Sequence, residues 1–285
     1  MTPGPLIIVG GREDKHDEKT ILRELVRRCD GGKLVVATVA SDVAEDVWKD
    51  YEKVFHELGV KDVVHLDVNS IEEARDPEHL KLIEGASLVY FTGGDQLKIT
   101  TRLGGTPLLD KIMELHESGA VIAGTSAGAS VMSATMLTGG ENDDSHKVGN
   151  WMMAPGLGLT KEMIIDQHFA QRGRIGRLLG AVALNPGLLC VGIDEDTSII
   201  VTETGFEVFG SNAVYILDGR EVLKTNITEA PRDSIMTIYG VKLHVLGHGD
   251  IFDFGMRQPL IEGSQAQAQM QIQSEKNGSA QASAH

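Results

Sequence analysis

Short apolar runs alternate with amphipathic stretches through the first half of this 285-residue chain, and that alternation constrains the fold more than any other feature. Strands separated by helices of this length predict a parallel sheet covered on both faces. In such a sheet the ligand site lies beyond the carboxyl ends of the strands. The strand-like runs lie at 6–9, 33–39, 63–66, 88–91 and 121–123, and the helical spacing at 18–28, 43–58, 71–83 and 108–118.

The second half of the chain has shorter and less regular apolar segments, which predict antiparallel strands added to the same domain. Since no Pro- or Ser-rich linker separates the halves, we expect one α/β domain over 1–261. From 262 to 285 the chain is rich in Gln, Ser and Ala and has no aromatic residue, so it predicts a disordered tail without a catalytic role. The added strands are expected at 191–193, 198–202, 207–208, 213–217 and 235–245.

The segment Gly-Thr-Ser-Ala-Gly-Ala at 124–129 follows directly on the last apolar run of the first half. A short strand that leads into a serine flanked by small residues, with a helix after it, is typical of a nucleophile held on a sharp turn. The N–H groups and partial positive charge of the helix N-terminus then lie beside Ser126. A glycine-rich turn without a catalytic role is the alternative, so the rest of the chain must supply a base, an acid and an oxyanion hole.

Glycine pairs end two other predicted strands, at 10–11 and 93–94. Together with Ser126 they stand at carboxyl ends of the sheet and are expected to face one crevice. An oxyanion hole needs two N–H donors aimed at one point. The amide of Ala127 is the usual first donor, and we expect Gly94 to supply the second because glycine permits the backbone angles involved. An ordinary Gly-Gly turn is the alternative.

His168 stands out among the histidines because it ends a short apolar run and follows Asp166 and Gln167. Taken alone, it fits a catalytic base and a hydrogen-bonded structural histidine equally well. Three arginines then follow within nine residues, in a chain whose net charge is −15. Such a cluster beside a base indicates carboxylate binding, with a solvated basic face as the alternative. The arginines are Arg172, Arg174 and Arg177.

The acid that would orient the histidine has several candidates. Three carboxylates, Asp-Glu-Asp at 194–196, follow a predicted strand. Because neighbouring residues of a strand point to opposite sides, only one of them would face His168, and the pattern does not choose among them. Asp143 and Asp144, in a glycine-bounded loop, are second candidates.

The composition narrows the class of protein further. A net charge of −15 argues against general binding of nucleic acid, whose phosphates would be repelled. The two cysteines, Cys29 and Cys190, predict neither a disulfide framework nor a metal site. His244 and His248 stand in a strand followed by a glycine turn, where we expect no metal. Without a basic N-terminal region or a membrane-length apolar run, the expected location is the cytoplasm, away from membranes.

Four segments carry this chemistry, and they occur together in the order Gly93-Gly94-Asp95-Gln96, Gly124-Thr125-Ser126-Ala127-Gly128-Ala129, Asp166-Gln167-His168-Phe169 with the three arginines, and Gly192-Ile193-Asp194-Glu195-Asp196-Thr197. As a set they closely resemble the cyanophycinases, serine exopeptidases of the dipeptidase E-like family. The resemblance covers about residues 5–255. It implies a flavodoxin-like, doubly wound fold akin to class I glutamine amidotransferases, a homodimer, and no metal or organic cofactor.

The resemblance also implies a role for each residue of these segments. Ser126 would be the nucleophile, His168 the general base and Glu195 the orienting acid. The substrate would be cyanophycin, a poly-aspartate backbone with an arginine on each β-carboxyl, cleaved through an acyl-enzyme to β-Asp-Arg dipeptides. Amides and carboxylates suit the guanidinium groups of this polymer, and arginines suit its main-chain carboxylates. The implied pocket residues are Gln96, Asp166, Gln167, Arg172, Arg174 and Arg177.

Three other functions compete with this one. An α-aspartyl dipeptidase of the same family would share Ser126 and His168 but has no need of three arginines and Gln167 beside the base. A glutamine amidotransferase-like domain would carry a cysteine where this chain has Ser126. A non-catalytic α/β module could use the strand-end glycines to bind an anion, with Ser126 as a hydrogen-bonding group only.

Overall fold

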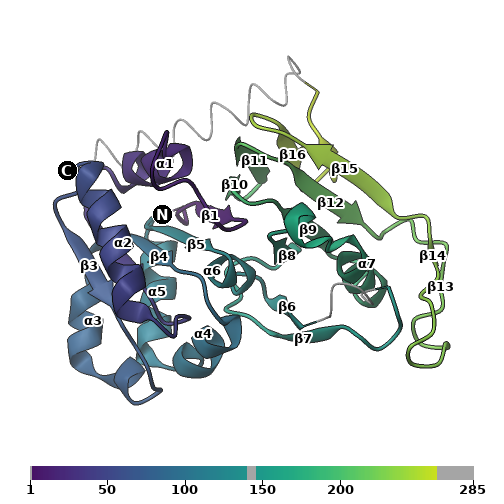
Figure 1. Ribbon diagram of the computed structural model, residues 1–285, viewed down its shortest axis with the longest axis horizontal. Helices are drawn as coiled ribbons and strands as arrows, with labels where there is room; N and C mark the ends of the chain where they lie inside the picture. Colours follow the sequence, from purple (N-terminus) through teal and green to yellow (C-terminus); the bar gives the residue numbers. More distant parts are fainter. Residues whose placement is uncertain (1, 140–145, 262–285) are drawn as a thin grey trace.

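The computed structural model describes residues 2–139 and 146–261, which form two main sheets with helices around them (Figure 1). The larger sheet has nine strands in the order β17-β16-β11-β10-β1-β5-β4-β2-β3, and the smaller has four in the order β15-β12-β9-β8. Two short ribbons complete the described strands: β6 (Thr135–Gly139) with β7 (Met152–Pro155), and β13 (Lys224–Thr225) with β14 (Ile238–Tyr239).

The first half of the chain builds the parallel part of the larger sheet. Its strands are β1 (Leu6–Val9), β2 (Lys33–Ala37), β3 (Val63–Leu66), β4 (Ala86–Phe91) and β5 (Val121–Thr125). The helices between them are α1 (Thr20–Cys29), α2 (Ala44–Glu57), α3 (Pro77–Ile83), α4 (Gln96–Leu103) and α5 (Pro107–Glu117). The predicted α/β fold, a parallel sheet flanked by helices with added antiparallel strands, is confirmed.

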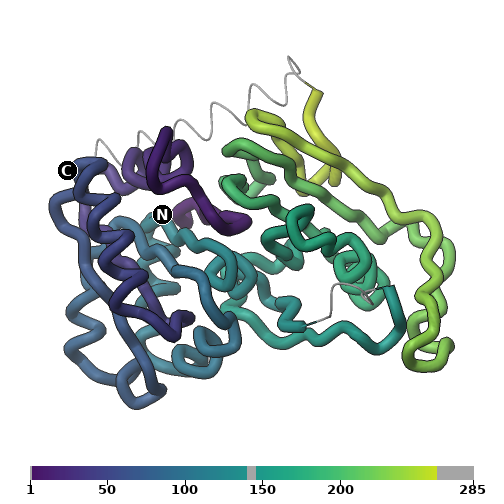
Figure 2. The backbone as a smooth tube through the Cα atoms, in the orientation of Figure 1, coloured from purple at the N-terminus to yellow at the C-terminus, as the bar shows by residue number. Residues whose placement is uncertain are grey.

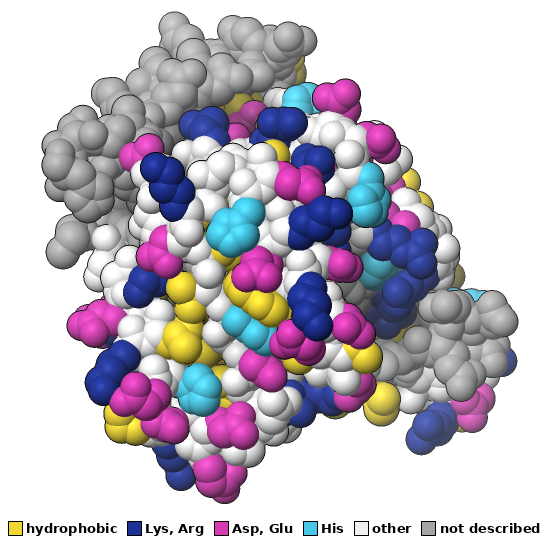
Figure 3. Space-filling model, turned by 60° about the vertical axis from the view of Figure 1, so that its left-hand side comes forward, with side chains coloured by type: hydrophobic (Ala, Val, Ile, Leu, Met, Phe, Trp, Pro, Cys, Tyr) yellow, Lys and Arg dark blue, Asp and Glu magenta, His cyan; other side chains and the backbone are white. Residues whose placement is uncertain are grey.

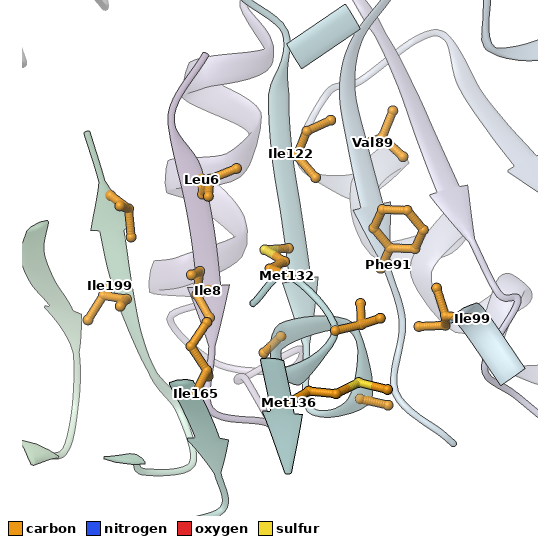
Figure 4. Packing of buried hydrophobic residues seen from close by; sticks show 14 of the residues in the cluster. Leu6, Ile8, Val89, Phe91, Ile99, Ile122, Met132, Met136, Ile165 and Ile199 are labelled. Atoms are coloured by element: carbon orange, nitrogen blue, oxygen red, sulfur yellow. The ribbon is translucent and has the colours of Figure 1, made fainter. Parts of the chain in front are cut away.

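Both faces of this sheet are buried, which is why its strands read as unbroken apolar runs. Ile7 and Val9 pack with α1 and α2 on one face. Leu6 and Ile8 point to the other face, where they meet the helices α3 to α5 and the smaller sheet. Figure 4 shows this second side, with Ile8 and Ile165 from the two sheets next to each other.

The second half of the chain adds antiparallel strands to the larger sheet and builds the smaller sheet, which has one parallel and two antiparallel strand pairs. To the larger sheet it adds β10 (Thr197–Val201), β11 (Gly205–Gly210), β16 (Ile251–Asp253) and β17 (Gln258–Pro259). The smaller sheet is made of β8 (Met163–Gln167), β9 (Leu189–Ile193), β12 (Val214–Asp218) and β15 (Lys242–Leu246). Its outer face is covered by α7 (Ile175–Leu184), whose buried side chains include Leu178 and Val182.

The chain therefore passes from one sheet to the other at 194–196, the short loop between β9 and β10. The sequence predicted strands on both sides of this loop but not that they belong to different sheets. This crossing brings the N-terminal segment after β1 beside the strands of the second half. In Figure 2 the dark purple chain after β1 runs toward the green strands.

Local chemistry explains where several helices begin. The helical pattern predicted over 71–83 is broken before Pro77, because proline disfavours a helical conformation of the residue before it. Asp76 instead caps α3, and its carboxylate accepts a hydrogen bond from the Glu78 N–H at 2.9 Å. Asp95 caps α4 in the same way through the Leu97 N–H at 2.8 Å, which holds the Gly93-Gly94 turn at the start of that helix.

Three predictions remain untested. The tail at 262–285 and the second-choice acids Asp143 and Asp144 lie outside the described residues. The single domain over 1–261 stays a prediction. In the part of the chain that the structure describes, no helix combines the length and the apolar character needed to cross a bilayer.

Candidate active site

Ser126 lies on a sharp turn between β5 and the short helix α6 (Ala127–Ser130). Its φ of 54° is unusual for a residue with a side chain, so the surrounding structure must hold the turn. Small neighbours make the turn possible. A Cβ on Gly124 would lie 2.6 Å from the Gly128 oxygen, and a Cβ on Gly128 would lie 2.3 Å from the Phe91 oxygen. Glycine is required at both positions because the backbones touch.

His168 follows β8 directly and reaches Ser126 from the smaller sheet. Its Nε2 lies 3.0 Å from the Ser126 Oγ, and its Nδ1 lies 2.7 Å from the Glu195 Oε1. The backbone N–H of His168 donates to the Gly10 oxygen at 2.8 Å, which ties it to the end of β1. The three side chains thus form a serine–histidine–carboxylate chain of hydrogen bonds, the geometry needed to activate a hydroxyl.

Close packing fixes the histidine ring. A Cβ on Gly11 would lie 2.4 Å from the ring carbon Cε1 of His168, so the glycine backbone lies flat against the imidazole. Behind it, a Cβ on Gly192 would lie 2.5 Å from the Phe169 ring, which in turn packs on Tyr215 at 5.0 Å between centroids. The imidazole has little room to leave the line between Ser126 and its carboxylate.

The pKa of His168 is lowered from its ordinary value, mainly by burial, which disfavours the charged form. The hydrogen bond to Glu195 opposes this shift, and the positive charges of Arg172 and Arg174 add to it. The lowered pKa favours the neutral imidazole, which is the form able to accept a proton from Ser126.

Only one of the three carboxylates at 194–196 faces the histidine. Asp194 points the other way and accepts a hydrogen bond from the Ala170 N–H at 2.8 Å. Asp196 holds the loop after β1 by accepting from the Asp14 N–H at 2.9 Å. Of the three carboxylates, Glu195 is the one that contacts His168, a distinction that the alternating strand pattern did not make.

The turn after β4 lies against the serine. A Cβ on Gly93 would lie 3.4 Å from the Ser126 Cβ. Gly94 has a φ of 141°, and a side chain there would collide with the Ala40 oxygen at 2.1 Å. On the other side, Ala127 is the first residue of α6, whose N–H has no partner within the helix. Two backbone segments rich in N–H groups therefore flank Ser126.

The predicted pocket residues divide into two groups. Gln167 is almost fully buried, and its Oε1 lies 3.5 Å from the Ser126 Oγ. Gln96 donates to the Leu137 oxygen at 2.9 Å, and Arg172 is exposed close enough to His168 to lower its pKa.

The second group is a buried ion network. Asp166 is fully buried and accepts from the Arg177 Nε at 2.7 Å and from the Arg174 Nη1 at 3.2 Å. Both guanidinium groups are less than one-tenth exposed. Burial lowers the pKa of Arg174 to about 10. Two of the three arginines that the sequence assigned to substrate carboxylates thus already neutralise a carboxylate of the protein, and Arg172 is the exposed one.

Two residues beside this site carried no signal in the sequence. Glu13 is buried and accepts a hydrogen bond from the Thr125 hydroxyl at 2.6 Å, directly next to Ser126. Arg12 is exposed, with its Nε 3.5 Å from the Glu195 Oε1. Neither belongs to a recognisable motif, because the partner of each residue lies far from it in the sequence.

Neither cysteines nor metal ligands gather at the site. Among the described residues, no three His, Cys, Asp or Glu side chains are grouped so that they could hold a metal ion. Cys29 and Cys190 are free and buried, and burial raises the pKa of the Cys29 thiol to about 11.

On the face that Figure 3 shows, carboxylates are spread among lysines and arginines, so the negative charge does not gather into one patch there.

An α/β sheet that ends in a serine on a strained turn, with a histidine and a carboxylate in line, defines the class of serine hydrolases. The chain belongs to peptidase family S51, whose model matches residues 6–209, and it is a serine peptidase. It is 35% identical over 259 residues to a cyanophycinase of Geminocystis herdmanii, and the matched region covers 90% of this chain and 95% of the relative. It is 32% identical to a cyanophycinase of Thermosynechococcus vestitus over 90% of this chain and 80% of that one.

One more distant relative is similar in sequence, and one solved structure is similar in fold. A peptidase E of a Nostoc species is 27% identical over 173 residues, 58% of this chain and 66% of that one. The crystal structure of a peptidase from an acI-B1 actinobacterium has a TM-score of 0.65 and 23% identity, over 88% of this chain and 97% of that chain. This structural likeness supports the α/β fold.

Proposed function

We propose that this serine peptidase is a cyanophycinase, which hydrolyses cyanophycin from one end to β-Asp-Arg dipeptides. The observation that carries the mechanism is the line of Ser126, His168 and Glu195, with contacts of 3.0 and 2.7 Å. The substrate is supported by relatives named cyanophycinase that are 32–35% identical over about 90% of the chain.

In the proposed mechanism, Ser126 Oγ attacks the α-peptide carbonyl of an aspartyl residue while His168 Nε2 takes the hydroxyl proton. Glu195 holds the imidazole through Nδ1 and stabilises its charged form. The N–H groups of Ala127 and Gly94 bind the developing oxyanion. His168 then gives its proton to the departing amine, and a water molecule, deprotonated by the same base, releases the acyl group and restores the serine.

The binding site needs groups of both charges, because the substrate presents both carboxylates and guanidinium groups. We assign the main-chain carboxylate to Arg172, which is exposed beside His168. Gln96 and Gln167 supply amide groups for the guanidinium. Asp166, Arg174 and Arg177 form the wall behind them in this proposal, since their charges already pair with one another. We further propose a cytoplasmic homodimer.

The experiment is mass spectrometry of the products that the purified chain releases from cyanophycin, with the dipeptide Asp-Leu as a second substrate. Release of β-Asp-Arg units alone, without longer fragments, supports the proposal. Hydrolysis of Asp-Leu with no action on the polymer would instead assign the α-aspartyl dipeptidase activity, the alternative function. Size-exclusion chromatography of the same sample tests the dimer.

A pair of variants tests the nucleophile. Ser126→Ala is expected to lower kcat by at least about 10⁴-fold, because it removes the group that forms the acyl-enzyme. Ser130→Ala is the control, since that serine is close in the chain, at the end of α6, and is buried away from His168. Full activity of Ser126→Ala would leave Ser126 without a catalytic role.

A further inference from the structure

A carboxylate that no step of the mechanism uses is buried directly below the serine turn. Glu13 is 4% exposed, and hydroxyl groups surround it. Its Oε1 accepts from the hydroxyls of Tyr51 and Tyr90, the latter at 2.7 Å, and its Oε2 accepts from the Thr125 Oγ1 at 2.6 Å. No ion pair to Glu13 is formed within residues 2–139 and 146–261. A buried carboxylate is costly unless it is hydrogen-bonded, and these three hydroxyls together stabilise it.

The two tyrosines can act only as donors to this carboxylate. Burial raises the pKa of Tyr51 and of Tyr90 well above the ordinary value, so both hydroxyls keep their protons at pH 7. Their rings pack at 5.1 Å between centroids, and they approach Glu13 from α2 and β4. Thr125 approaches from β5, on the side of the active site.

Thr125 connects this cluster to the nucleophile. It is the last residue of β5, and the next residue, Ser126, has the unusual φ of 54°. A residue in such a conformation persists only when its surroundings hold it. The hydrogen bond from Thr125 to Glu13 fixes the residue on the strand side of the turn.

The loop at 10–13, which ends in Glu13, also contacts His168 and Glu195. The Gly10 oxygen accepts from the His168 N–H at 2.8 Å, the Gly11 backbone lies against the His168 ring, and the Arg12 Nε lies 3.5 Å from the Glu195 Oε1. Glu13 follows these residues and bonds to β5 through Thr125. One loop from the larger sheet therefore contacts the serine strand, the histidine and the acid.

From this geometry we propose that Glu13 is a positioning residue for the nucleophile. Through Thr125 it sets the place of the Ser126 hydroxyl relative to His168, and it locks the loop at 10–13 to the strand that carries the serine. The inference rests on the proposed role of Ser126, and it assigns to Glu13 no contact with substrate.

The test measures how fast a small fluorophosphonate modifies Ser126, because this reaction needs the serine and the base but no substrate pocket. The serine Oγ–P bond forms, the P–F bond breaks to release fluoride, and the hydroxyl proton passes to His168. The main variant is Thr125→Val, which keeps the shape and removes the hydroxyl. Tyr51→Phe is the matched control, since it removes another hydroxyl from the same carboxylate on the side away from Ser126. Thr125→Ser restores the hydroxyl.

We expect Thr125→Val to slow both modification and kcat by about 10- to 100-fold with KM nearly unchanged, the size of effect that a small misplacement of a reacting group produces. Thr125→Ser should recover the rate. Tyr51→Phe should lower the melting temperature about as much as Thr125→Val while keeping the rate within about threefold of the unaltered protein. Equal losses of melting temperature with no loss of rate in either variant would overturn the proposal and leave Glu13 with a structural role only.

Failure of the proposed function gives a different result. If the unaltered protein is not modified at Ser126, and Ser126→Ala still hydrolyses peptide, the nucleophile is wrong and the inference falls with it. If Ser126 is modified normally in every variant, only the inference falls. Should Thr125→Val not fold, Glu13→Gln takes its place. Slow modification of Ser126 in that variant supports the proposal, and the unaltered rate overturns it.

Discussion

Two buried carboxylates stand behind the candidate active site, one in each half of the molecule, and they are held in opposite ways. Close to Ser126, in the loop after β1, Glu13 is held by three hydroxyl groups. Beside His168, in the smaller sheet, Asp166 is held by two arginines. Within residues 2–139 and 146–261, the partners of Glu13 are neutral hydroxyls, whereas Asp166 lies between two cations.

The two buried carboxylates have different roles, one in stability and one in the position of the serine. Losing one hydroxyl from a buried carboxylate leaves other donors in place and costs about 1–3 kcal/mol. Removing the carboxylate of a buried ion pair leaves charges without a partner and costs about 3–5 kcal/mol. The cluster at Asp166 therefore matters most for stability, and the cluster at Glu13 for the position of the serine. The predictions below test that division.

The largest expected effect is on stability. Asp166→Asn should lower the free energy of unfolding by about 3–5 kcal/mol, because Arg174 and Arg177 lose their shared carboxylate inside the protein. Urea denaturation measures the change. The control is Asp218→Asn, which breaks a similar buried pair with Arg257 at the opposite end of β9. Both variants should lose stability, and only Asp166→Asn should also lose activity. A loss below about 1 kcal/mol for Asp166→Asn would contradict the comparison, because breaking a buried ion pair costs more than that.

The next effect is on the histidine. Gly11→Ala places a methyl group within 2.5 Å of the His168 ring, so the imidazole must move and kcat/KM should fall by about 100-fold. Gly59→Ala is a matched control. Gly59 has a similar φ of 93° but an open space around it, so its replacement strains the backbone without touching the ring. Equal kcat/KM in the two variants would show that the packing of Gly11 on His168 has no role in catalysis.

A smaller effect is expected on the pH profile. The base works only when neutral, so the rate of Ser126 modification should fall as the pH drops through the lowered pKa of His168. Arg172→Gln removes a positive charge that lowers this pKa. The pKa then rises, more of the imidazole is protonated at a given acidic pH, and the acidic limb moves to higher pH by less than about one unit. Arg220→Gln, an exposed change after β12, should leave the limb in place. Movement of the limb to lower pH would contradict the assignment.

The smallest effect is expected at the rim. Arg12 is 76% exposed, and its contact with Glu195 is 3.5 Å long. Exposed ion pairs contribute little, so Arg12→Ala should change kcat/KM by less than about threefold, in contrast to its neighbour Gly11. Steady-state kinetics at low and high salt measure the change. A loss as large as that of Gly11→Ala would place Arg12 among the residues that bind substrate.

Much of the fold could be predicted because its signals are local. The alternation of apolar runs and helical spacing located β1 to β5 and most of the helices between them. Turn chemistry located the strand ends, and the expectation that the glycine pairs and Ser126 face one crevice agrees with the contacts of Gly11 and Gly93. The segment 71–83 is mostly helical as predicted, and Pro77 divides it into a short 3-10 helix and α3.

The site could be predicted only in part. Ser126 and His168 follow strands in recognisable motifs, and the structure brings them within hydrogen-bonding distance. The choice of Glu195 over its two neighbours depended on a resemblance, because alternation along a strand does not say which side faces a partner in another sheet. The pairing of Arg174 with Asp166 was missed because charge in a sequence does not reveal which partner neutralises it.

What the sequence determined by itself is therefore the set of elements and the chemistry at their ends, since periodicity and turn residues act over a few positions. The tertiary structure decided which charges meet. The chain crosses between the two sheets at 194–196, which brings Glu195 into contact with His168. The loop after β1 brings Glu13 into contact with Thr125, the residue before Ser126. Burial makes these pairings strong, and burial is a property of the folded chain rather than of any segment of it.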